Sequence, residues 1–284
     1  MMEEIKLSIL PQVIKQRPSN SHKGTFGRIL LIGGSKNYGG AIMMATEGAL
    51  NSGAGLLFVA TDPFNATALH TRNPEAMFID WNDQKKLAEI ISTVDIIICG
   101  MGLDTNDFAR KILVTLKDNI TNKQTVVLDA SALDLLSQDH NLLPKKANNI
   151  IFTPHQMEWQ RLSGIKIAEQ NDANNIEALK ELVAKEKAYL VLKSNHTKIY
   201  DREGSILLNP LGNPGMATGG MGDTLAGIIG SFCGQFGINL KIIGAAVYLH
   251  SLAGDEIYQN NYFVRPTNLS ALLPKLMKKY GEKN

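Results

Sequence analysis

The sequence has few cysteines and no long apolar run. Its two cysteines, Cys99 and Cys233, lie inside apolar segments, and neither has another Cys or a His at metal-site spacing. We therefore expect buried free thiols, as in a reducing compartment. No apolar run reaches membrane-spanning length, and the first residues do not form a secretory signal. These absences exclude a disulfide scaffold and predict a cytoplasmic protein with no membrane partner.

The chain also lacks an excess of charge of one sign. Its 284 residues include 29 basic and 27 acidic side chains, and only a short group of lysines (Lys275, Lys278 and Lys279) stands out. Such a group is more typical of a solvated helix than of a nucleic-acid site, so we expect no nucleic-acid partner. Because no repeat, low-complexity segment or linker divides the chain, residues 1–284 are expected to form a single domain.

Short apolar runs alternate with longer amphipathic stretches over much of the chain. The runs are residues 29–32, 56–59, 96–99, 125–128, 150–152 and 190–192. They lack polar alternation, which is typical of parallel strands that helices cover on both faces. A hairpin is predicted from the runs 198–200 and 206–208 and the turn between them. The pattern predicts an α/β fold whose mostly parallel sheet has an antiparallel edge.

Three helices are predicted from apolar periodicity. Residues 40–52 have an alanine at every fourth position from Ala41, and this face of small side chains is expected to approach the sheet closely. Beyond Gly222 the pattern predicts two apolar helices, of which the second extends from about residue 242 to 257.

A glycine-rich segment, residues 213–223, runs directly into the first of these apolar helices. It reads Asn-Pro-Gly-Met-Ala-Thr-Gly-Gly-Met-Gly-Asp. Glycines let backbone N–H groups converge, and a helix N-terminus adds partial positive charge, so the segment predicts a phosphate site. Asp223 falls in the first helical turn, where the helix dipole favours the carboxylate, so we expect a low pKa. It is predicted to accept a proton late in the attack of a hydroxyl on phosphorus, and helix capping is the alternative.

Polar residues follow several of the expected strands, and each set has a structural alternative. Residues 33–41 are rich in glycine but lack the spacing of a dinucleotide motif or a P-loop. They form either a tight turn between a strand and a helix or a contact with a ligand. His155 and Glu158 follow a strand, so they are expected at the edge where open α/β sheets bind ligands. The alternatives are that His155 has only a structural role and that Glu158 is simply an acidic residue in the first turn of a helix. Residues 193–197 suit a nucleotide phosphate or ribose, although composition alone favours a polar turn. Asp129 either holds Mg²⁺ through water or caps a helix.

Taken together and in this order, these segments resemble the ADP/ATP-dependent NAD(P)H-hydrate dehydratase family of the ribokinase-like superfamily. The resemblance runs from residue 22 to residue 255, and the string Ala-Thr-Gly-Gly-x-Gly-Asp at 217–223 is its most specific part. It implies a three-layer α/β/α sandwich in which substrate and nucleotide meet along one edge of the sheet. It also implies that a phosphoryl group passes from ADP or ATP to the C6 hydroxyl of the S form of hydrated NADH or NADPH, and that phosphate is then eliminated.

The resemblance also implies a role for each matching residue. Asp223 acts at the reacting hydroxyl, while Gly220 and Gly222 belong to the catalytic anion hole and Glu158 lies near Mg²⁺. The residues expected to bind the hydrated dinucleotide are Ala41, Gly102, His155 and Asp223. Those expected to bind ADP or ATP are Lys193, Ser194, Asn195, His196, Thr197 and Gly222. A separate epimerase in the same pathway and a homotetrameric assembly are also implied.

The sequence departs from the usual family pattern at four positions. Asp104 and Ser194 stand where glycine is common, Ser131 replaces a second acid, and Met221 replaces a frequent threonine. Asp104 bears on the substrate side of the site. Two other functions are weighed against the dehydratase: a vitamin-precursor kinase of the hydroxymethylpyrimidine or hydroxyethylthiazole type, and a nucleotide-binding module without turnover.

Overall fold

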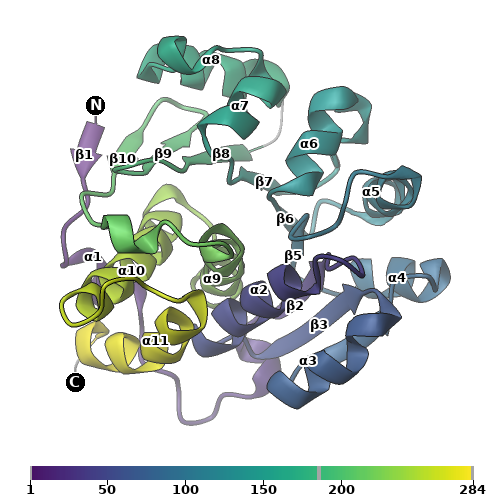
Figure 1. Cartoon of the computed structure of the whole chain (residues 1–284), viewed down its shortest axis with the longest axis horizontal. Coiled ribbons are helices and arrows are strands. Elements are labelled where there is room, and N and C mark those ends of the chain that lie inside the picture. The colour runs from purple at the N-terminus through teal and green to yellow at the C-terminus, as the bar shows by residue number, and fades with distance from the viewer. Residues whose placement is uncertain (1, 184–186, 283–284) are drawn as a thin grey trace.

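The computed structural model describes residues 2–183 and 187–282, and a ten-stranded sheet forms its centre (Figure 1). The strands are β1 (Met2–Glu4), β2 (Arg28–Ile32), β3 (Leu56–Thr61), β4 (Met77–Asp80), β5 (Ile96–Cys99), β6 (Thr125–Leu128), β7 (Asn149–Phe152), β8 (Lys187–Leu192), β9 (Lys198–Asp201) and β10 (Ile206–Leu208). Their order across the sheet is β1-β10-β9-β8-β7-β6-β5-β2-β3-β4.

Only β9 runs against its neighbours in this sheet. It pairs antiparallel with both β8 and β10, whereas every other pairing is parallel. The six strands and the hairpin expected from the sequence are therefore confirmed. Two strands were not predicted: β1, which pairs with β10 and forms the outermost strand, and β4 at the opposite edge.

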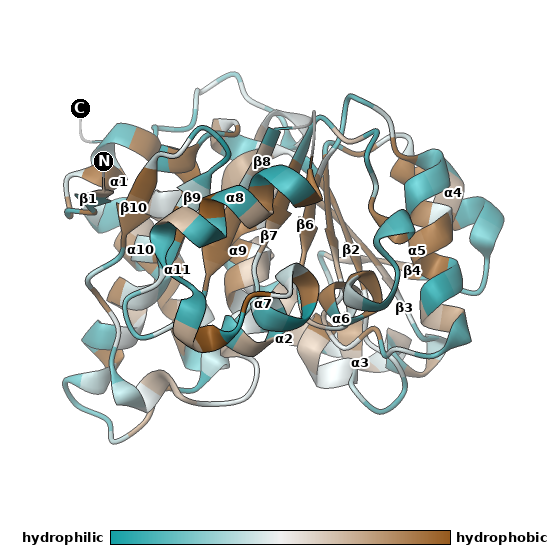
Figure 2. Ribbon diagram, turned by 90° about the horizontal axis from the view of Figure 1, so that it is seen from above, coloured by the Kyte–Doolittle hydropathy of each residue, from teal (hydrophilic) through white to brown (hydrophobic). Residues whose placement is uncertain are grey.

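Helices cover both faces of the sheet, as the three-layer prediction requires (Figures 1 and 2). The helices are α1 (Ile9–Val13), α2 (Gly39–Asn51), α3 (Ala66–Arg72), α4 (Gln84–Ile91), α5 (Asp107–Asn119), α6 (Ser131–Gln138), α7 (Gln156–Ser163), α8 (Asp172–Leu182), α9 (Met221–Phe236), α10 (Leu240–Tyr258) and α11 (Pro266–Tyr280). One hydrophobic core joins a face of the sheet to α1, α2, α9, α10 and α11, and a second core joins the other face to α4 through α8. No helix in the described ranges is both long and apolar enough to cross a membrane.

The small-residue face of α2 shares a core with β2 and β3, and α2 also packs closely against α9. A side chain at Gly227 of α9 would overlap the Ala45 carbonyl, and one at Gly48 of α2 would overlap the Thr224 carbonyl. Only residues without a bulky side chain allow the two backbones to come this close. The contact lies one turn from the start of α9 and therefore fixes the end of that helix that carries Asp223.

The backbone is strained immediately after β6. Ala130 follows Asp129 with φ 48° and ψ −122°, a combination that residues with a Cβ rarely adopt. It precedes the first residue of α6, so Asp129 and the strained Ala130 together connect the end of β6 at Leu128 to this helix. The surrounding packing therefore holds a conformation that alanine alone disfavours.

We predict that Ala130→Gly raises the free energy of unfolding by about 1 kcal/mol, because release of strain outweighs the extra entropy of the unfolded chain. Urea denaturation followed by circular dichroism measures this change. Ala132→Gly is the matched control, because Ala132 is fully buried inside α6 and its replacement should destabilise the protein. Equal destabilisation by both variants would show that Ala130 is not strained.

Candidate active site

Loops that follow five parallel strands meet at the carboxyl edge of the sheet. After β2 and β5, Gly34 N–H donates to the Met101 carbonyl over 2.8 Å, and Ser35 N–H donates to the Gly102 carbonyl over 2.7 Å. After β7 and β8, Lys193 N–H donates to the Pro154 carbonyl over 2.8 Å. Parallel strands bring segments that are distant in sequence to one edge, where α/β proteins bind ligands.

The centre of this edge is a buried group of charges around Lys193. Its Nζ lies 2.8 Å from Asp129 Oδ1 and 3.9 Å from Glu158 Oε2. Thr153 Oγ1 donates to the same Asp129 oxygen over 2.9 Å. The Asp129 side chain is 1% exposed, so its charge depends on these partners rather than on water.

Asp223 belongs to this group and its pKa is the opposite of what the sequence predicts. Burial raises the pKa of Asp223 to about 7, and the negative charges of Asp129 and Glu158 add to the increase, while Lys193 opposes it. No described residue donates a hydrogen bond to this carboxylate, so burial outweighs the helix N-terminus. The expected low pKa is therefore wrong. A carboxylate that titrates near neutrality is a better proton acceptor than the sequence suggested.

Burial also affects the pKa values of Glu158 and Lys193 in this group. Burial raises the pKa of Glu158, although the neighbouring Lys193 lowers it. Burial by itself would lower the pKa of Lys193, but attraction to Asp129 and Glu158 outweighs burial and leaves this pKa raised. Lys193 therefore stays positively charged at neutral pH and balances several carboxylates.

The glycine-rich loop brings the start of α9 next to Lys193. Gly220, with φ 92°, precedes α9, and a side chain there would overlap the Met44 sulfur. A Cβ atom at Gly222 would lie 3.1 Å from Lys193 Nζ. Gly220 therefore permits the turn, and Gly222 leaves space for the ammonium beside the first N–H groups of the helix. This geometry suits the binding of a phosphate.

His155 and Glu158 begin α7 as a reciprocal cap. His155 Nδ1 accepts the N–H groups of Met157 (3.1 Å) and Glu158 (3.2 Å), and Glu158 Oε2 accepts the His155 N–H over 2.8 Å. The structural alternative for both residues is therefore present. It does not remove them from the site, because the cap holds Glu158 3.9 Å from Lys193.

A pocket of about 680 Å³ opens beside Lys193 and Gly222. This volume falls within the range of roughly 300–1,000 Å³ that is typical of small-molecule sites. Its lining includes His155 and the whole segment 193–197, so it contains all six residues expected to bind ADP or ATP. Its apolar wall includes Leu211, Met216, Leu225 and Val247.

Ala41 and Gly102 lie together on a different side of the carboxyl edge. A Cβ atom at Gly102, which has φ 63°, would lie 3.0 Å from the Ala41 Cβ and would also overlap the Tyr38 carbonyl. Neither residue lines the pocket that contains His155. The structure therefore pairs two of the expected substrate residues and places His155 with the nucleotide residues.

The departure at Asp104 has a conformational explanation. Asp104 has φ 77°, in the left-handed region that glycine favours, and its Oδ1 accepts the Thr105 N–H over 2.6 Å. Aspartate tolerates this region better than most residues because its short side chain bonds locally. The turn after Gly102 thus keeps a glycine-like backbone.

His250 of α10 is a polar residue of the pocket that sequence reasoning did not assign. It is 5% exposed and lines the pocket, and its Nε2 has no hydrogen-bond partner among residues 2–183 and 187–282. Burial lowers the pKa of His250 to about 4, so the imidazole is neutral at physiological pH. The periodicity of its helix placed it among apolar residues and gave no sign of a polar role.

Comparisons with known proteins agree on one family. A model of the NAD(P)H-hydrate dehydratase family matches residues 29–275. An ADP-dependent (S)-NAD(P)H-hydrate dehydratase of Enterococcus faecalis is 46% identical to this chain, covering 99% of it and 94% of the relative. A ribokinase-like protein structure from E. faecalis superposes with a TM-score of 0.95 at 45% identity, covering 99% and 97% of the two chains. The Bacillus subtilis ADP/ATP-dependent NAD(P)H-hydrate dehydratase, co-crystallised with ATP and Mg²⁺, gives 0.83 at 30% identity, covering 97% of each.

We predict that Asp223→Asn stabilises the fold, and more at pH 8 than at pH 5. The unfolded carboxyl titrates near 3.8 and the folded one near 7, so folding becomes less favourable as pH rises between these values. Asn removes this cost, and the difference between the two pH values should be on the order of 2 kcal/mol. Thermal unfolding at both pH values measures it. A stability gain that does not change with pH would contradict the raised pKa.

Proposed function

The chain belongs to the NAD(P)H-hydrate dehydratase family, and we propose that it restores NADH or NADPH from the S form of the hydrated nucleotide, with ADP as phosphoryl donor. The observation that carries this proposal is the meeting of three features at one sheet edge. These are the glycine-rich start of α9, the Lys193 ammonium beside Gly222, and the Asp223 carboxyl with a pKa of about 7.

The reaction uses phosphoryl transfer to remove water. The C6 hydroxyl of the hydrate is a poor leaving group, so its oxygen attacks the terminal phosphorus of ADP, AMP leaves, and the hydroxyl proton passes to Asp223. The phosphate ester then breaks at its carbon–oxygen bond. Inorganic phosphate departs with the bonding electrons, and a proton lost from the adjacent ring carbon restores the double bond. The enzyme therefore uses a kinase-like step to perform the reaction of a lyase.

Asp223 is the proposed proton acceptor, and its neighbours supply the electrostatics. With a pKa of about 7 the carboxyl is partly ionised at neutral pH, which suits general-base catalysis. The backbone N–H groups from Gly220 to Gly222 and the Lys193 ammonium would stabilise the transferred phosphoryl group. ADP would occupy the pocket lined by residues 193–197.

The hydrated dinucleotide is proposed to reach Asp223 from the other side. Ala41 and Gly102 leave a surface without bulky side chains, which would let the substrate backbone come close. His155 lines the nucleotide pocket, and its Nδ1 already caps α7. Its contact with the dinucleotide would therefore use the Nε2 edge of the ring.

Magnesium fits this site as an ion held mainly by the nucleotide. Glu158 Oε2 accepts the His155 N–H and Asp129 Oδ1 accepts Thr153 and Lys193, which leaves Asp129 Oδ2 and Glu158 Oε1, the latter 3.5 Å from His155 Nε2, as the oxygens that could face a ligand. The part of the chain that the structure describes holds no group of three or more His, Cys, Asp or Glu that could bind a metal alone. Mg²⁺ often uses one or two carboxylates together with phosphates, so Glu158 would supply one ligand. The bound ion would neutralise phosphate charge.

We also propose a cellular location, an oligomeric state and a partner enzyme for this protein. Buried free thiols at Cys99 and Cys233 support a reducing, cytoplasmic location. The exposed aromatic side chains of Tyr262 (94%) and Phe263 (52%) suit a partner surface, and we propose that such contacts build the homotetramer that the family resemblance implies. A separate epimerase would convert the R form of the hydrate into the S form that this chain uses.

A vitamin-precursor kinase remains the second candidate because it would need the same anion loop and carboxyl. Full-length relatives at 43–46% identity carry the dehydratase name, and this favours the dehydratase. A binding module without turnover would not need a carboxyl with a pKa near 7 beside the anion loop.

We predict that the purified protein with Mg²⁺ and ADP restores the dihydronicotinamide absorbance of NADH hydrate, and that Asp223→Asn lowers kcat by at least about a thousandfold. Nucleotide affinity, measured by calorimetry, should stay within about threefold because Asp223 does not line the nucleotide pocket. A stable phosphorylated vitamin precursor with no action on the hydrate would overturn the dehydratase assignment.

We also predict that kcat/KM rises with pH through about 7 as Asp223 ionises, and that Lys193→Gln moves this midpoint upward. The Lys193 charge lowers the pKa of Asp223, so its loss should raise the midpoint by about one unit. Lys198→Gln is the control, because Lys198 pairs with Asp172 instead. An unchanged midpoint in Lys193→Gln would argue that another group controls the profile.

A further inference from the structure

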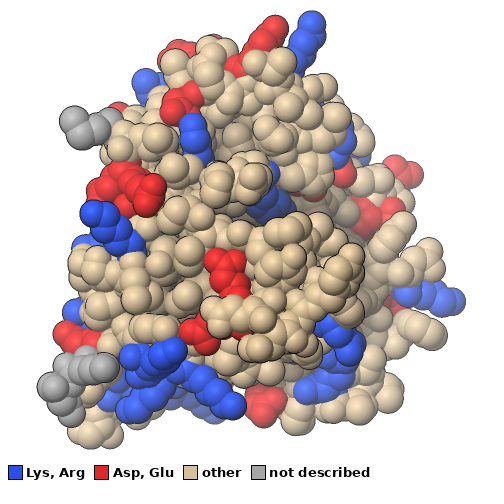
Figure 3. Space-filling model, turned by 60° about the vertical axis from the view of Figure 1, so that its left-hand side comes forward, with Lys and Arg blue, Asp and Glu red and all other residues tan. Residues whose placement is uncertain are grey.

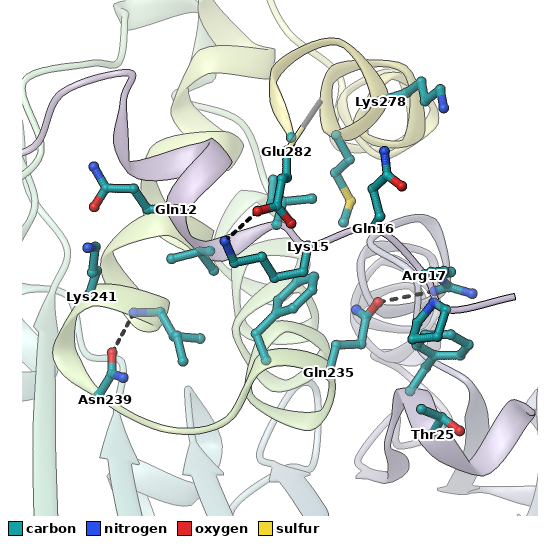
Figure 4. Close-up of a pocket in the computed structure, with 18 residues that line it drawn as sticks. Gln12, Lys15, Gln16, Arg17, Thr25, Gln235, Asn239, Lys241, Lys278 and Glu282 are labelled. Atoms are coloured by element: carbon teal, nitrogen blue, oxygen red, sulfur yellow. Dashed lines mark hydrogen bonds and ion pairs between the residues drawn. The ribbon is translucent and has the colours of Figure 1, made fainter. Parts of the chain in front are cut away.

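A second pocket lies at the other end of α9, away from the proposed active site (Figure 4). Its volume is about 1250 Å³. It is lined by the chain segment 12–18, the last residues of α9, the first residues of α10 and the last turn of α11 with Gly281 and Glu282. Since α9 has 16 residues, the two ends of this helix are about 24 Å apart. None of the proposed site residues reaches this pocket.

The charged side chains of this pocket are mostly basic. Lys15, Arg17, Lys241 and Lys278 line it, and Glu282 is the one carboxylate among its described lining residues. Glu282 is already bound to Lys15, whose Nζ lies 3.0 Å away. Lys241 and Lys278 form no ion pair within the described ranges. Basic side chains also gather at the lower edge of the face in Figure 3, at the height of α11 in Figure 1.

Arg17 is held in place at the pocket wall. Its guanidinium lies 3.8 Å over the Phe26 ring, and Nη2 donates to Gln235 Oε1 over 3.1 Å and to the Gly53 carbonyl. These bonds use a single nitrogen, so the Nε and Nη1 groups have no partner among the described residues. A fixed, planar guanidinium with unused donors suits a carboxylate or a phosphate.

The start of α10 adds to the positive potential, and the rest of the pocket is apolar. Asn239 caps this 19-residue helix by accepting the Ile242 N–H over 3.0 Å, and Lys241 lies in its first turn. The helix N-terminus carries partial positive charge that points toward the lining residues. Val13, Ile14, Phe236, Ile242 and Met277 supply apolar surface.

We propose that this pocket is a second binding site, which takes a small organic anion with an apolar body and a phosphate or carboxylate group. The anionic group would lie near Arg17, Lys241 and the start of α10, and the apolar body would cover Ile14, Phe236 and Met277. The site is distinct from the nucleotide pocket, so ADP and this ligand bind together.

The test uses the fluorescent probe anilinonaphthalene sulfonate, which combines an anionic group with an apolar body. The probe is titrated into the full chain in the presence of saturating ADP, and its dissociation constant is compared between variants. In the double variant Lys241→Glu and Lys278→Glu this constant should rise at least about fivefold, because two attractive charges become repulsive. These residues are exposed, so the variant should fold.

The matched control is the double variant Lys85→Glu and Lys275→Glu. It changes the net charge equally at exposed positions that do not line the pocket, so its dissociation constant should equal that of the wild type. Three results would overturn the proposal: unchanged binding in the pocket variant, equal weakening in the control, or displacement of the probe by ADP.

Discussion

The site depends on one ammonium group that balances several buried carboxylates. Lys193 Nζ is bound to Asp129, lies near Glu158 and acts on Asp223 across the start of α9. Burial raises the pKa of both Asp223 and Glu158, and at Asp223 the negative charges of Asp129 and Glu158, which one ammonium does not fully compensate, add to the increase. The same charge that holds the loops together therefore sets the protonation of the proposed base. The close packing of α2 on α9 fixes the start of α9, which carries Asp223.

Much of the fold could be predicted from the sequence, because buried parallel strands leave a strong pattern. The uninterrupted β-branched runs at β2, β3 and β5 through β8 marked each strand. β1 was missed because its three residues are exposed and two are charged, so only its pairing with β10 makes it a strand. The packing of α2 on α9 was not predicted, because periodicity identifies a small face but not every element that packs against it.

The sequence predicted several candidate residues that the structure brings together, but it did not predict their electrostatics. Glycine spacing located the anion loop and the position of Asp223, whereas the upward shift of its pKa comes first from burial and then from Asp129 and Glu158, which lie far away in sequence. Capping explained His155 and Glu158 locally, and only the structure placed this cap beside Lys193. His250 fell within the segments that resemble the family but received no role, because its periodicity is that of a buried helix. Sequence patterns within one segment therefore did not predict the properties that depend on residues from distant segments.

Titration of the Asp223 carboxyl shows whether burial or the helix N-terminus controls its pKa. Carbon-13 NMR of the carboxyl carbons, with the Asp223 signal assigned by its absence in Asp223→Asn, measures this pKa in the folded protein. We predict a midpoint of about 7. A midpoint near the ordinary aspartate value of about 3.9 would show that the helix N-terminus outweighs burial, and it would contradict the central claim.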